Sequence, residues 1–281
     1  MNSANRTMIS AVILNYRNTA MTLRCVEAFE AAAREADIVV ETIIVDNSAK
    51  ESGETLRSAV GTGRILIANE ENRGFAAANN QGFAQASAPY VLAVNNDAFA
   101  TAESLRRGLE YLEANPKAAF WAPRLVFGDG RHQHSIGSVP TLKSLLVEYL
   151  LPARFSMGRE VAAPEPCEVG TVTGAFILMR REILESLGGF DESYFFTMED
   201  VDLCARVRDA GYHVVYDPVS SVVHLGGGSQ HWKWLYDPHL HRSRILFFRK
   251  RQGPVAALLA SIIIGTGLFI RRAANLGRVE S

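Results

Sequence analysis

Residues 90–97 read YVLAVNND, an apolar run of strand length that is followed at once by two amides and a carboxylate. The same arrangement occurs twice earlier in the chain, where Ile9–Leu14 ends at Asn15 and Ile38–Val45 ends at Asp46. Short, continuous apolar runs are typical of strands that are buried on both faces of a parallel sheet. We therefore predict a sheet whose strands end in polar side chains.

Helical segments separate these strands. Leu23, Val26 and Phe29 recur at helical spacing after Asn18 or Thr19, either of which can cap a helix. Arg64–Ala68 is a short third strand, and the Ala-rich segment Phe75–Ala86 is the next helix. Strands that alternate with helices predict an α/β fold with right-handed crossovers and a mostly parallel sheet.

Ligands of such sheets bind at the carboxyl ends of the strands, which is where this sequence places its polar residues. The residues at these three strand ends are Asn15; Asp46 and Asn47; and Asn95, Asn96 and Asp97. Further along the chain the patterns are weaker. There we predict strands over Trp121–Phe127, His132–Ile136, Glu168–Met179, His213–Tyr216 and Ser221–His224, helices over Thr141–Leu151, Arg181–Leu187 and Glu199–Ala210, and a loop over Arg154–Glu168.

Length and composition limit the classes of protein to consider. The 281 residues, 48% hydrophobic and 21% charged, suffice for one large α/β domain with a short appendage. A net charge of -1 gives no overall field that would attract nucleic acid. The three cysteines, Cys25, Cys167 and Cys204, are too widely spaced for a structural zinc site and indicate inert thiols in a reducing compartment.

Three carboxylates gather at the start of one predicted helix, at Glu199, Asp200 and Asp202. A helix N-terminus attracts negative charge, so capping is one explanation of the cluster. Because capping needs only one or two acids, we expect one of the three to point into a cleft. There it would act as a general base toward a hydroxyl group.

Three other residues have both a chemical and a purely structural interpretation. Asp97 is a candidate ligand for Mg²⁺ or Mn²⁺ bound to a diphosphate, or a turn residue. Asp46 is a candidate partner of a nucleobase or ribose, or the start of an Asx turn. His224, in VVHLGGGS, is a candidate second metal ligand, or a core histidine before a flexible loop.

Seven motifs in order carry a resemblance to a known family: AVILNY (11–16), IIVDNS (43–48), NRGFAAANNQGF (72–83), VLAVNNDAF (91–99), TGAFILMRREILESLGGFDESYFF (173–196), MEDVDLCARVRDAGY (198–212) and VVHLGGGS (222–229). Together, over about residues 8–250, they resemble the family 2 glycosyltransferases, in the rhamnosyltransferase-like and galactofuranosyltransferase-like branch. The resemblance implies a GT-A fold, in which helices flank a Rossmann-like, mostly parallel sheet. It also implies a nucleotide-diphosphate-sugar donor, a divalent metal and inversion at the anomeric carbon.

The resemblance also implies roles for residues in the donor half of the site. Asn15 and Tyr16 match the nucleotide edge of the first strand, and Asp46, with Asn47 beside it, matches the aspartate that holds the nucleobase. A further donor-binding segment is implied at Arg73, Gly74 and Asn79.

In the reactive half, Asp97 matches the last acid of the metal motif, and His224 matches the histidine that completes the metal site. The motif reads Asn95-Asn96-Asp97 here instead of DxD, so metal binding is expected to depend more on the diphosphate. Asp200 matches the catalytic base, with Glu199 beside it. The segment that lines the sugar and acceptor pocket corresponds to Gly174 and Ala175.

The C-terminal part differs in character, so we predict a glycosyltransferase domain over 1–230 and a helical tail over 231–281. In the tail Trp232, Trp234 and Tyr236 precede a basic stretch, His239–Arg251, from which Arg242 or Arg244 could reach the donor diphosphate. The 17-residue apolar run Pro254–Ile270 follows, and then Arg271-Arg272.

A helix lying in the membrane interface explains this tail best, although a spanning helix or a core or dimer helix stays open. Because the first residues lack a signal-peptide pattern, we expect a cytoplasmic enzyme, peripheral at the inner face of the membrane, with a homodimer as one option.

The expected reaction is sugar transfer from TDP-rhamnose or a UDP-sugar to a glycan or polyprenyl-diphosphate-linked acceptor. The alternative is a non-catalytic, membrane-associated module that binds nucleotide-sugars. Asn15–Thr19 lacks the glycine-rich basic loop of a nucleotidyltransferase and the GxGxxG of a dehydrogenase.

Overall fold

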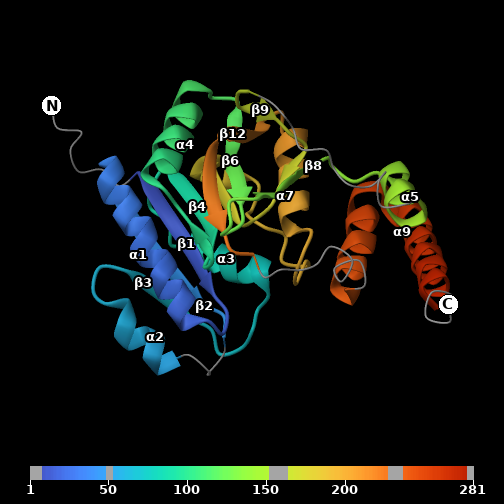
Figure 1. The fold of residues 1–281 in the computed structure, drawn as a ribbon, viewed down its shortest axis with the longest axis horizontal. Coiled ribbons are helices and arrows are strands. Elements are labelled where there is room, and N and C mark those ends of the chain that lie inside the picture. Colours follow the sequence, from blue (N-terminus) through green and yellow to red (C-terminus); the bar gives the residue numbers. More distant parts are fainter. Residues whose placement is uncertain (1–7, 49–52, 152–163, 227–236, 277–281) are drawn as a thin grey trace.

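A computed structural model describes residues 8–48, 53–151, 164–226 and 237–276 (Figure 1). The strands of the central sheet are β1 (Ile9–Asn15), β2 (Val40–Asp46), β3 (Ile65–Ala68), β4 (Tyr90–Asn95), β5 (Ala98–Phe99), β6 (Ala118–Val126), β7 (His132–Gln133), β9 (Cys167–Glu168), β11 (Phe176–Arg180) and β12 (His213–His224). A separate pair of strands comprises β8 (Ile136–Gly137) and β10 (Thr171–Val172). The helices are α1 (Thr19–Ala36), α2 (Gly53–Val60), α3 (Phe75–Phe83), α4 (Ala102–Ala114), α5 (Leu142–Leu150), α6 (Arg181–Ser186), α7 (Glu199–Asp209) and α9 (Pro238–Leu276).

The central sheet has the order β3-β2-β1-β4-β11-β6-β12-β5. Its first four strands in space run parallel, whereas β11 is antiparallel to both neighbours, β4 and β6. Asn15 lies opposite Asp46 in the register of β1 and β2, and Leu14 lies opposite Asn95 in that of β1 and β4. The predicted α/β class and mostly parallel sheet are therefore confirmed, and the polar strand ends meet at one edge.

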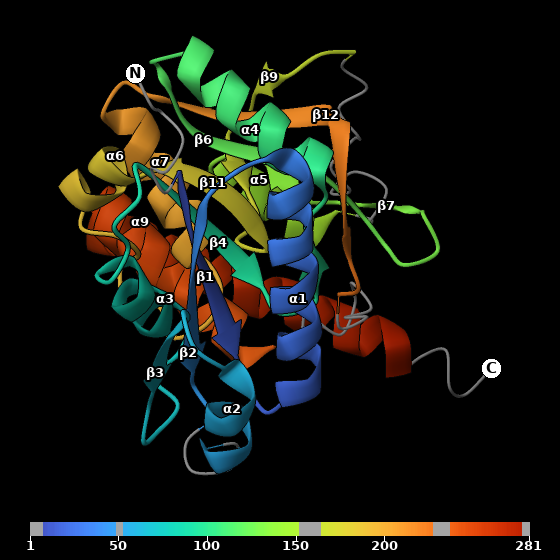
Figure 2. The same cartoon turned by 90° about the vertical axis from the view of Figure 1, so that its left-hand side faces the viewer.

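Alternating side chains divide the sheet between two hydrophobic cores. Ile9, Ala11 and Ile13 of β1 face the core that is completed by α1, α2 and α4, whereas Val12 faces the core that is completed by α3, α6 and α7. Figure 2 shows α1 and α4 lying across one side of the sheet. Burial on both faces explains why β1 and β4 are almost continuously apolar in sequence.

A third core joins the C-terminal helices to the loop before α7. Tyr149 of α5, Phe247 and Ala260 of α9, and Tyr194 and Met198 of the loop are all buried in it. Helix α9 bends at Gly253, whose φ of 87° is not helical, so its two segments both pack around α5. In Figure 1 these two helices lie beside α7, away from the sheet.

Several elements differ from the sequence-based prediction. The segment predicted as one strand over Glu168–Met179 is divided among β9, β10 and β11. Between β10 and β11 the backbone NH of Gly174 bonds the side chain of Asp200 in α7. The strands predicted over His213–Tyr216 and Ser221–His224 form one strand, β12, with an irregular register between Asp217 and Ser221.

The sequence patterns missed two helices and part of the organisation of the middle segment. Helices α2 and α4 were not predicted. Helix α4 begins with a capping box in which Thr101 is the N-cap and Ser104 stands three residues later, where glutamate is more usual. The strand predicted over His132–Ile136 is divided between β7 and β8, which belong to different sheets. Most of the loop predicted over Arg154–Glu168, together with Trp232, Trp234 and Tyr236, lies outside the described residues.

Candidate active site

The polar strand ends form a hydrogen-bonded row along the sheet edge. Asn15 Nδ2 donates to Asp46 Oδ1 at 2.9 Å and lies 3.1 Å from Ser48 Oγ. Thr22 Oγ1 donates to Asn15 Oδ1 at 2.7 Å and accepts from Asn96 Nδ2 at 3.0 Å. Side chains from the ends of β1, β2 and β4 thus lie in contact, as the parallel topology predicts.

Asp46 also has the structural role that the sequence left open. Its Oδ1 accepts from the backbone NH of Ser48 at 3.1 Å, which is an Asx turn, and the side chain is buried. Tyr16, the next residue after β1, is 46% exposed and lies against the guanidinium of Arg17. The structure therefore offers an exposed aromatic ring next to a buried carboxylate.

The predicted donor segment is tied to this edge through Asn47. Asn47 Oδ1 accepts from the backbone NH of Arg73 at 2.9 Å, and its Nδ2 donates to the carbonyl of Gly74 at 3.2 Å. The side chain of Arg73 is exposed. Asn79, in contrast, is buried and donates to the carbonyl of Phe75 within α3. Of this segment, Arg73 is therefore the side chain that a ligand in solution can reach.

Asp97 and His224 face each other at the end of β4. His224 Nε2 lies 3.2 Å from Asp97 Oδ1 and 3.5 Å from Asn95 Nδ2. On the other side of the ring, His224 Nδ1 lies 2.8 Å from Gln133 Oε1, which can only accept. Nδ1 therefore carries a proton; Nε2 donates to Asp97 when the ring is also protonated there, and in the neutral ring its lone pair is available to a cation held between the two side chains.

This arrangement fits a divalent cation. A histidine that donates through one nitrogen to a neighbouring oxygen and presents the other beside a carboxylate is typical of metal ligands. Neighbouring ligands of an octahedral ion at about 2.1 Å lie about 3.0 Å apart, close to the observed separation of Asp97 and His224. Within the described residues no group of three His, Cys, Asp or Glu converges, so these two would bind an ion together with other oxygens.

The ionisation of Asp97 suits the same role. Partial burial opposes its charged form, but the protonated His224 ring, which donates a hydrogen bond to Asp97 and carries a positive charge, holds the pKa of Asp97 below its usual value. Asp97 is therefore charged at neutral pH. Gln133, which orients His224 from β7, was missed by the sequence analysis, because no local pattern connects residues 133 and 224.

The three acids at the start of α7 have separate surroundings. Asp202 forms an ion pair with Arg206 at 2.7 Å, one turn further along the helix. Asp200 accepts from the backbone NH of Gly174 at 2.9 Å and of Val201 at 2.7 Å. Glu199 is 5% exposed, and its Oε2 has no hydrogen-bond partner among the described residues. Asp202 is thus structural, and the other two acids are candidates for chemistry.

Burial raises the pKa of Glu199 well above its ordinary value of 4.5, and the nearby charge of Asp200 raises it further. Burial also raises the pKa of Asp200, against the opposing effect of its backbone hydrogen bonds. A carboxylate whose pKa is raised toward neutrality is a stronger proton acceptor than an exposed aspartate. The pair therefore has the acid–base character that a general base requires.

One strand contact links the acid pair to the Asp97–His224 pair. The backbone NH of Asn95, two residues before Asp97, donates to the carbonyl of Ala175 at 2.9 Å. The neighbouring Gly174 binds Asp200, and a Cβ on Gly174 would lie 3.7 Å from the Cβ of Asp200. The pairing of β4 with β11 thus connects the Asp97–His224 pair and Asp200 through the backbone of Gly174 and Ala175.

The two arginines predicted to reach a diphosphate differ in their surroundings. Arg244 donates to Tyr149 Oη at 2.7 Å and pairs with Glu148 at 2.8 Å, so α5 occupies its guanidinium. The side chain of Arg242 is exposed and makes no hydrogen bond or ion pair with another described residue. Arg242 is therefore the better candidate for a phosphate contact.

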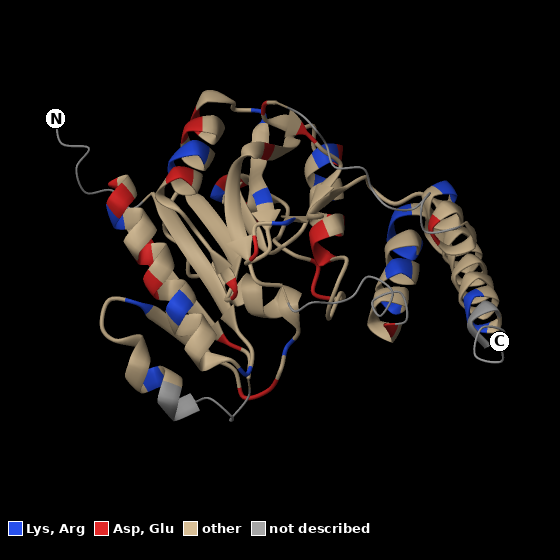
Figure 3. Cartoon of the chain, in the orientation of Figure 1, with Lys and Arg blue, Asp and Glu red and all other residues tan. Residues whose placement is uncertain are grey.

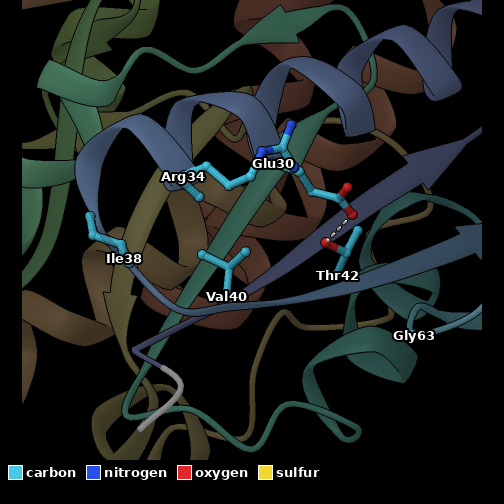
Figure 4. Close-up of a pocket in the computed structure, with 7 residues that line it drawn as sticks. Glu30, Arg34, Ile38, Val40, Thr42 and Gly63 are labelled. Atoms are coloured by element: carbon cyan, nitrogen blue, oxygen red, sulfur yellow. Dashed lines mark hydrogen bonds between the residues drawn. The ribbon is translucent and has the colours of Figure 1, made fainter. Parts of the chain in front are cut away.

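A cavity of about 240 Å³ lies elsewhere, between α1 and β2 (Figure 4). It is lined by Glu30, Ala33, Arg34, Ile38, Val40, Thr42 and Gly63. Val40 begins β2, whereas Asp46 ends it, so this cavity lies at the opposite sheet edge from the candidate site. The acid that lines the cavity, Glu30, forms an ion pair with Arg64 at 2.7 Å and accepts a hydrogen bond from the hydroxyl of Thr42. We assign it no role.

The buried Glu199 leads to a prediction about stability. The folded protein binds a proton at this acid more tightly than the unfolded chain does, so the free energy of unfolding should fall as pH rises above about 4.5. Glu199→Gln should make the free energy of unfolding less dependent on pH, by at most about 1.4 kcal/mol per pH unit. Relative to the parent protein, the variant should gain most stability at the alkaline end of the range. Denaturant unfolding between pH 5 and 8, on this variant and the parent protein, measures the effect; parallel curves would contradict it.

Comparisons with known proteins bear on the whole arrangement. The family model described as glycosyl transferase family 2 matches residues 10–188, more than half of the chain. The N-acetylglucosaminyl-diphospho-decaprenol L-rhamnosyltransferase of Mycobacterium tuberculosis is 30% identical over 177 residues, covering 57% of this chain and 58% of that protein. The rhamnosyltransferase WbbL of Escherichia coli is 27% identical over 138 residues, covering 48% and 52%.

A further curated relative, from Sinorhizobium fredii, is matched over only 22% of its length, so the chain spans less than two thirds of each of these three relatives. The crystal structure of GalNAc-T7 with UDP, GalNAc and Mn²⁺ superimposes with a TM-score of 0.63 at 16% identity, covering 87% of this chain and 48% of that one. This likeness confirms the GT-A fold. The chain belongs to glycosyl transferase family 2 and is rhamnosyltransferase-like.

Proposed function

We propose that the protein transfers a sugar from a nucleotide-diphosphate-sugar to a hydroxyl of a glycan or lipid-linked glycan, with inversion at the anomeric carbon. The observation that carries the proposal is the contact of Asp97 with His224 at 3.2 Å, joined through the β4–β11 pairing to Asp200. The Asp97–His224 pair suits a cation with its diphosphate, and Asp200 suits the hydroxyl of an acceptor. Group transfer between a nucleotide and an acceptor needs both.

A divalent cation, Mg²⁺ or Mn²⁺, would be held by Asp97 and His224 together with donor phosphate oxygens. When bound, it supplies Lewis-acid stabilisation of the negative charge that develops on the departing nucleotide diphosphate. Gln133 holds the His224 ring in the orientation and tautomer that binding requires. The structure of GalNAc-T7, which shares the fold and was solved with UDP and Mn²⁺, supports this proposal.

Asp200 is the proposed general base. Its carboxylate would take the proton of the acceptor hydroxyl as that oxygen attacks the anomeric carbon from the face opposite the nucleotide. The backbone NH groups of Gly174 and Val201 fix the orientation of the carboxylate during this step. Burial of Asp200 itself raises its proton affinity.

Residues at the sheet edge would bind the donor. Asp46 and Asn15 lie where a nucleobase and ribose would meet the strand ends, and Tyr16 offers an exposed ring. The exposed side chain of Arg73, with Gly74 next to it in the chain, would contact the diphosphate. The names of the two rhamnosyltransferase relatives favour rhamnose as the sugar, which we propose is carried as TDP-rhamnose before a UDP-sugar. The decaprenol relative's name favours a polyprenyl-diphosphate-linked acceptor, in cell-envelope polysaccharide synthesis.

Nucleotide release over a panel of donors, with Mg²⁺ or Mn²⁺ and a lipid-linked acceptor, tests the proposal. We expect one donor to give acceptor-dependent release of nucleotide diphosphate. A non-catalytic module that only binds nucleotide-sugars is the competing function. Tight donor binding without turnover of any donor would establish that alternative and exclude the transferase.

We further propose that the protein is peripheral at the cytoplasmic face of the membrane and contacts it through α9. In chain order its cations are Arg242, Arg244, Arg249, Lys250, Arg251, Arg271 and Arg272, and it has no acid (Figure 3). Arg244, Lys250 and Arg251 are paired with acids of other elements, so the attraction to anionic lipid rests on the remaining four arginines. In the most apolar 18-residue window, with a mean hydropathy of 2.1, only 28% of the residues are buried, so α9 is not an ordinary core helix.

The exposed apolar residues of α9 lie on one face. They are Val255, Leu258, Leu259, Ile262, Phe269 and Ile270, which follow one another at helical spacing. The opposite face packs on α5 through Ala256, Ala260 and Ile264. Because the run Pro254–Ile270 is only about 26 Å long and one face of it is covered by protein, an in-plane position fits better than a span.

Leu258→Glu combined with Ile262→Glu should weaken binding to anionic phospholipid vesicles by about tenfold or more, because two large apolar side chains no longer enter the lipid. Vesicle sedimentation measures the binding. Val219→Glu, at an exposed position on β12, is the control and should bind as the parent protein does. Unchanged binding of the double variant would contradict the membrane proposal. A change from dimer to monomer instead would identify this face as a dimer interface.

A further inference from the structure

Two neighbouring aromatic side chains, Phe195 and Phe196, are exposed just before the proposed base. Each is 47% exposed, although large apolar side chains are usually buried. They precede Asp200 by five and four residues, in the loop that leads into α7. Phe195 and Phe196 together form the aromatic pair.

The aromatic pair is exposed because the main chain around it is fixed. Tyr194 and Met198, on either side of the pair, are buried in the third core against α9. The carbonyl of Phe196 accepts from Ser243 Oγ of α9 at 3.1 Å. A loop anchored on both sides in this way does not leave its rings in solvent through disorder.

The backbone after the pair is strained as well. Thr197 and Met198 have φ values of 68° and 73°, in the left-handed region that residues other than glycine rarely adopt. Strain of this kind persists only where surrounding contacts impose it, and it gathers at ligand sites. Here the strain lets Met198 enter the third core while the aromatic pair points outward.

The first ring of the pair lies against the donor segment. The carbonyl of Phe195 accepts from the backbone NH of Phe75 at 2.9 Å. A Cβ on Gly74 would lie 2.5 Å from that carbonyl oxygen and 2.9 Å from a ring carbon of Phe195. Only glycine allows this approach, so the aromatic pair borders the proposed diphosphate segment.

The same region reaches the proposed base through Phe75. The ring of Phe75 would touch a Cβ on Gly174 at 3.4 Å, and that Cβ would lie 3.7 Å from the Cβ of Asp200. The starts of α3 and α7 therefore lie side by side (Figure 1), with the aromatic pair on the loop that connects into α7. A molecule held on the pair would be flanked by the donor segment and by the base.

Buried polar atoms in the same loop also indicate a ligand. Thr197 Oγ1 and Glu199 Oε2 have no hydrogen-bond partner among the described residues, although the two side chains are only 7% and 5% exposed. Buried polar atoms are nearly always satisfied by protein, water or ligand. Two such atoms within three residues, beside an exposed aromatic pair, are the features of a site that binds both polar and apolar groups.

We propose that Phe195 and Phe196 form the acceptor subsite and stack against the apolar C–H face of the acceptor sugar ring. The inference rests on the proposed function, because the sugar bound there is the one whose hydroxyl Asp200 deprotonates. An aromatic face offers a large, rigid contact area to such a ring, and the ring's hydroxyls remain free to meet polar groups at its edge. The aromatic pair then determines acceptor affinity, whereas the strand ends determine donor affinity.

Acceptor kinetics on Phe195→Ala and Phe196→Ala test the proposal. Each change should raise the KM for the acceptor about 5- to 10-fold, which is the scale of one aromatic contact. The KM for the donor and the slow hydrolysis of donor by water should stay within about twofold, because neither needs the acceptor subsite. Thermal unfolding checks that the variants are folded.

Conservative variants separate stacking from a general need for apolar side chains. Tyr at either position keeps the aromatic face and should preserve acceptor KM, whereas Leu keeps only the apolar character and should behave like Ala. Val219→Ala, at an exposed apolar position on β12, is the control and should change nothing.

The outcomes also distinguish this inference from the proposed function. An unchanged acceptor KM in folded Ala variants would overturn the aromatic subsite while leaving the transferase intact. Loss of donor hydrolysis in those variants would overturn it too, by assigning the aromatic pair to the donor. Absence of any donor turnover in the parent protein would instead reject the proposed function itself.

Discussion

Asp200→Asn should lower the rate of sugar transfer by about 10²- to 10⁴-fold, the usual scale for removing a general base. The amide has the same shape as the carboxylate, and its oxygen can still accept from one of the two backbone NH groups, Gly174 or Val201, that the carboxylate binds. It cannot take the acceptor proton. Donor affinity, measured by titration with the nucleotide-sugar, should stay within a few-fold of the parent value, because the donor contacts lie at the strand ends.

The dependence of kcat/KM on pH in the parent enzyme should report the ionisation of Asp200. Burial raises the pKa of Asp200, and only its ionised form acts as a base, so kcat/KM should fall as pH decreases through this raised pKa. The acidic limb should therefore lie above the ordinary aspartate value of 3.8 and disappear in Asp200→Asn. Asp209→Asn, at an exposed acid at the far end of α7, is the matched control. Transfer by Asp200→Asn at the parent rate would remove the base assignment.

Asp97→Ala should have an effect of similar size through the cation. The substitution removes the carboxylate that would bind the cation together with His224. A bound cation stabilises the departing diphosphate by several kcal/mol, and this stabilisation should be lost with the ion. We expect a loss of about 10²-fold or more in kcat/KM, together with a higher metal concentration for half-maximal rate. Transfer assays over a series of Mg²⁺ and Mn²⁺ concentrations measure both.

Gln133→Ala gives a graded version of the same test. It removes the acceptor that fixes the tautomer of His224, so metal affinity should fall by about 10- to 100-fold while the rate at saturating metal recovers. Asp129→Ala removes an exposed acid from the same hairpin and should leave both quantities unchanged. Full activity of the parent enzyme after treatment with a chelator, with the fold intact, would contradict the metal site.

The part of the fold that the sequence predicts well is the part controlled by local patterns. Ile9–Leu14 and Tyr90–Val94 are apolar on both faces because α1 and α3 lie on opposite sides of the sheet. Their ends then lie together because parallel strands align their carboxyl ends, so Asn15, Asp46 and Asn96 join one row. The tie between Asn47 and the Arg73 segment follows from the same topology.

The parts that were missed depend on contacts between distant segments. Gln133 meets His224 only because β7 pairs with β6 and β6 pairs with β12. Arg244 binds α5 because α9 folds back onto it, and a basic run in sequence does not say which of its members find acids. Gly174 divides a predicted strand because its NH is used by a helix that begins 25 residues later.

The C-terminal segment shows the same limit. An apolar run with small residues on one face and large ones on the other is compatible with membrane, partner or core, and the sequence cannot say which face the protein covers. The structure places Ala256, Ala260 and Ile264 on the covered face, in the core that also holds Met198. This core anchors the loop before Asp200 to α9, and the domain boundary near residue 230 stays a prediction.

The most direct test of the central proposal is an anomalous diffraction map from crystals that hold Mn²⁺ and the nucleotide diphosphate. We predict one Mn²⁺ peak, bound by the Asp97 carboxylate and His224 Nε2 and bridged to the diphosphate, with the Asp200 carboxylate facing the open side of that diphosphate. A nucleotide bound at the strand ends with no Mn²⁺ peak beside Asp97, or with the ion held by other residues, would contradict the proposal.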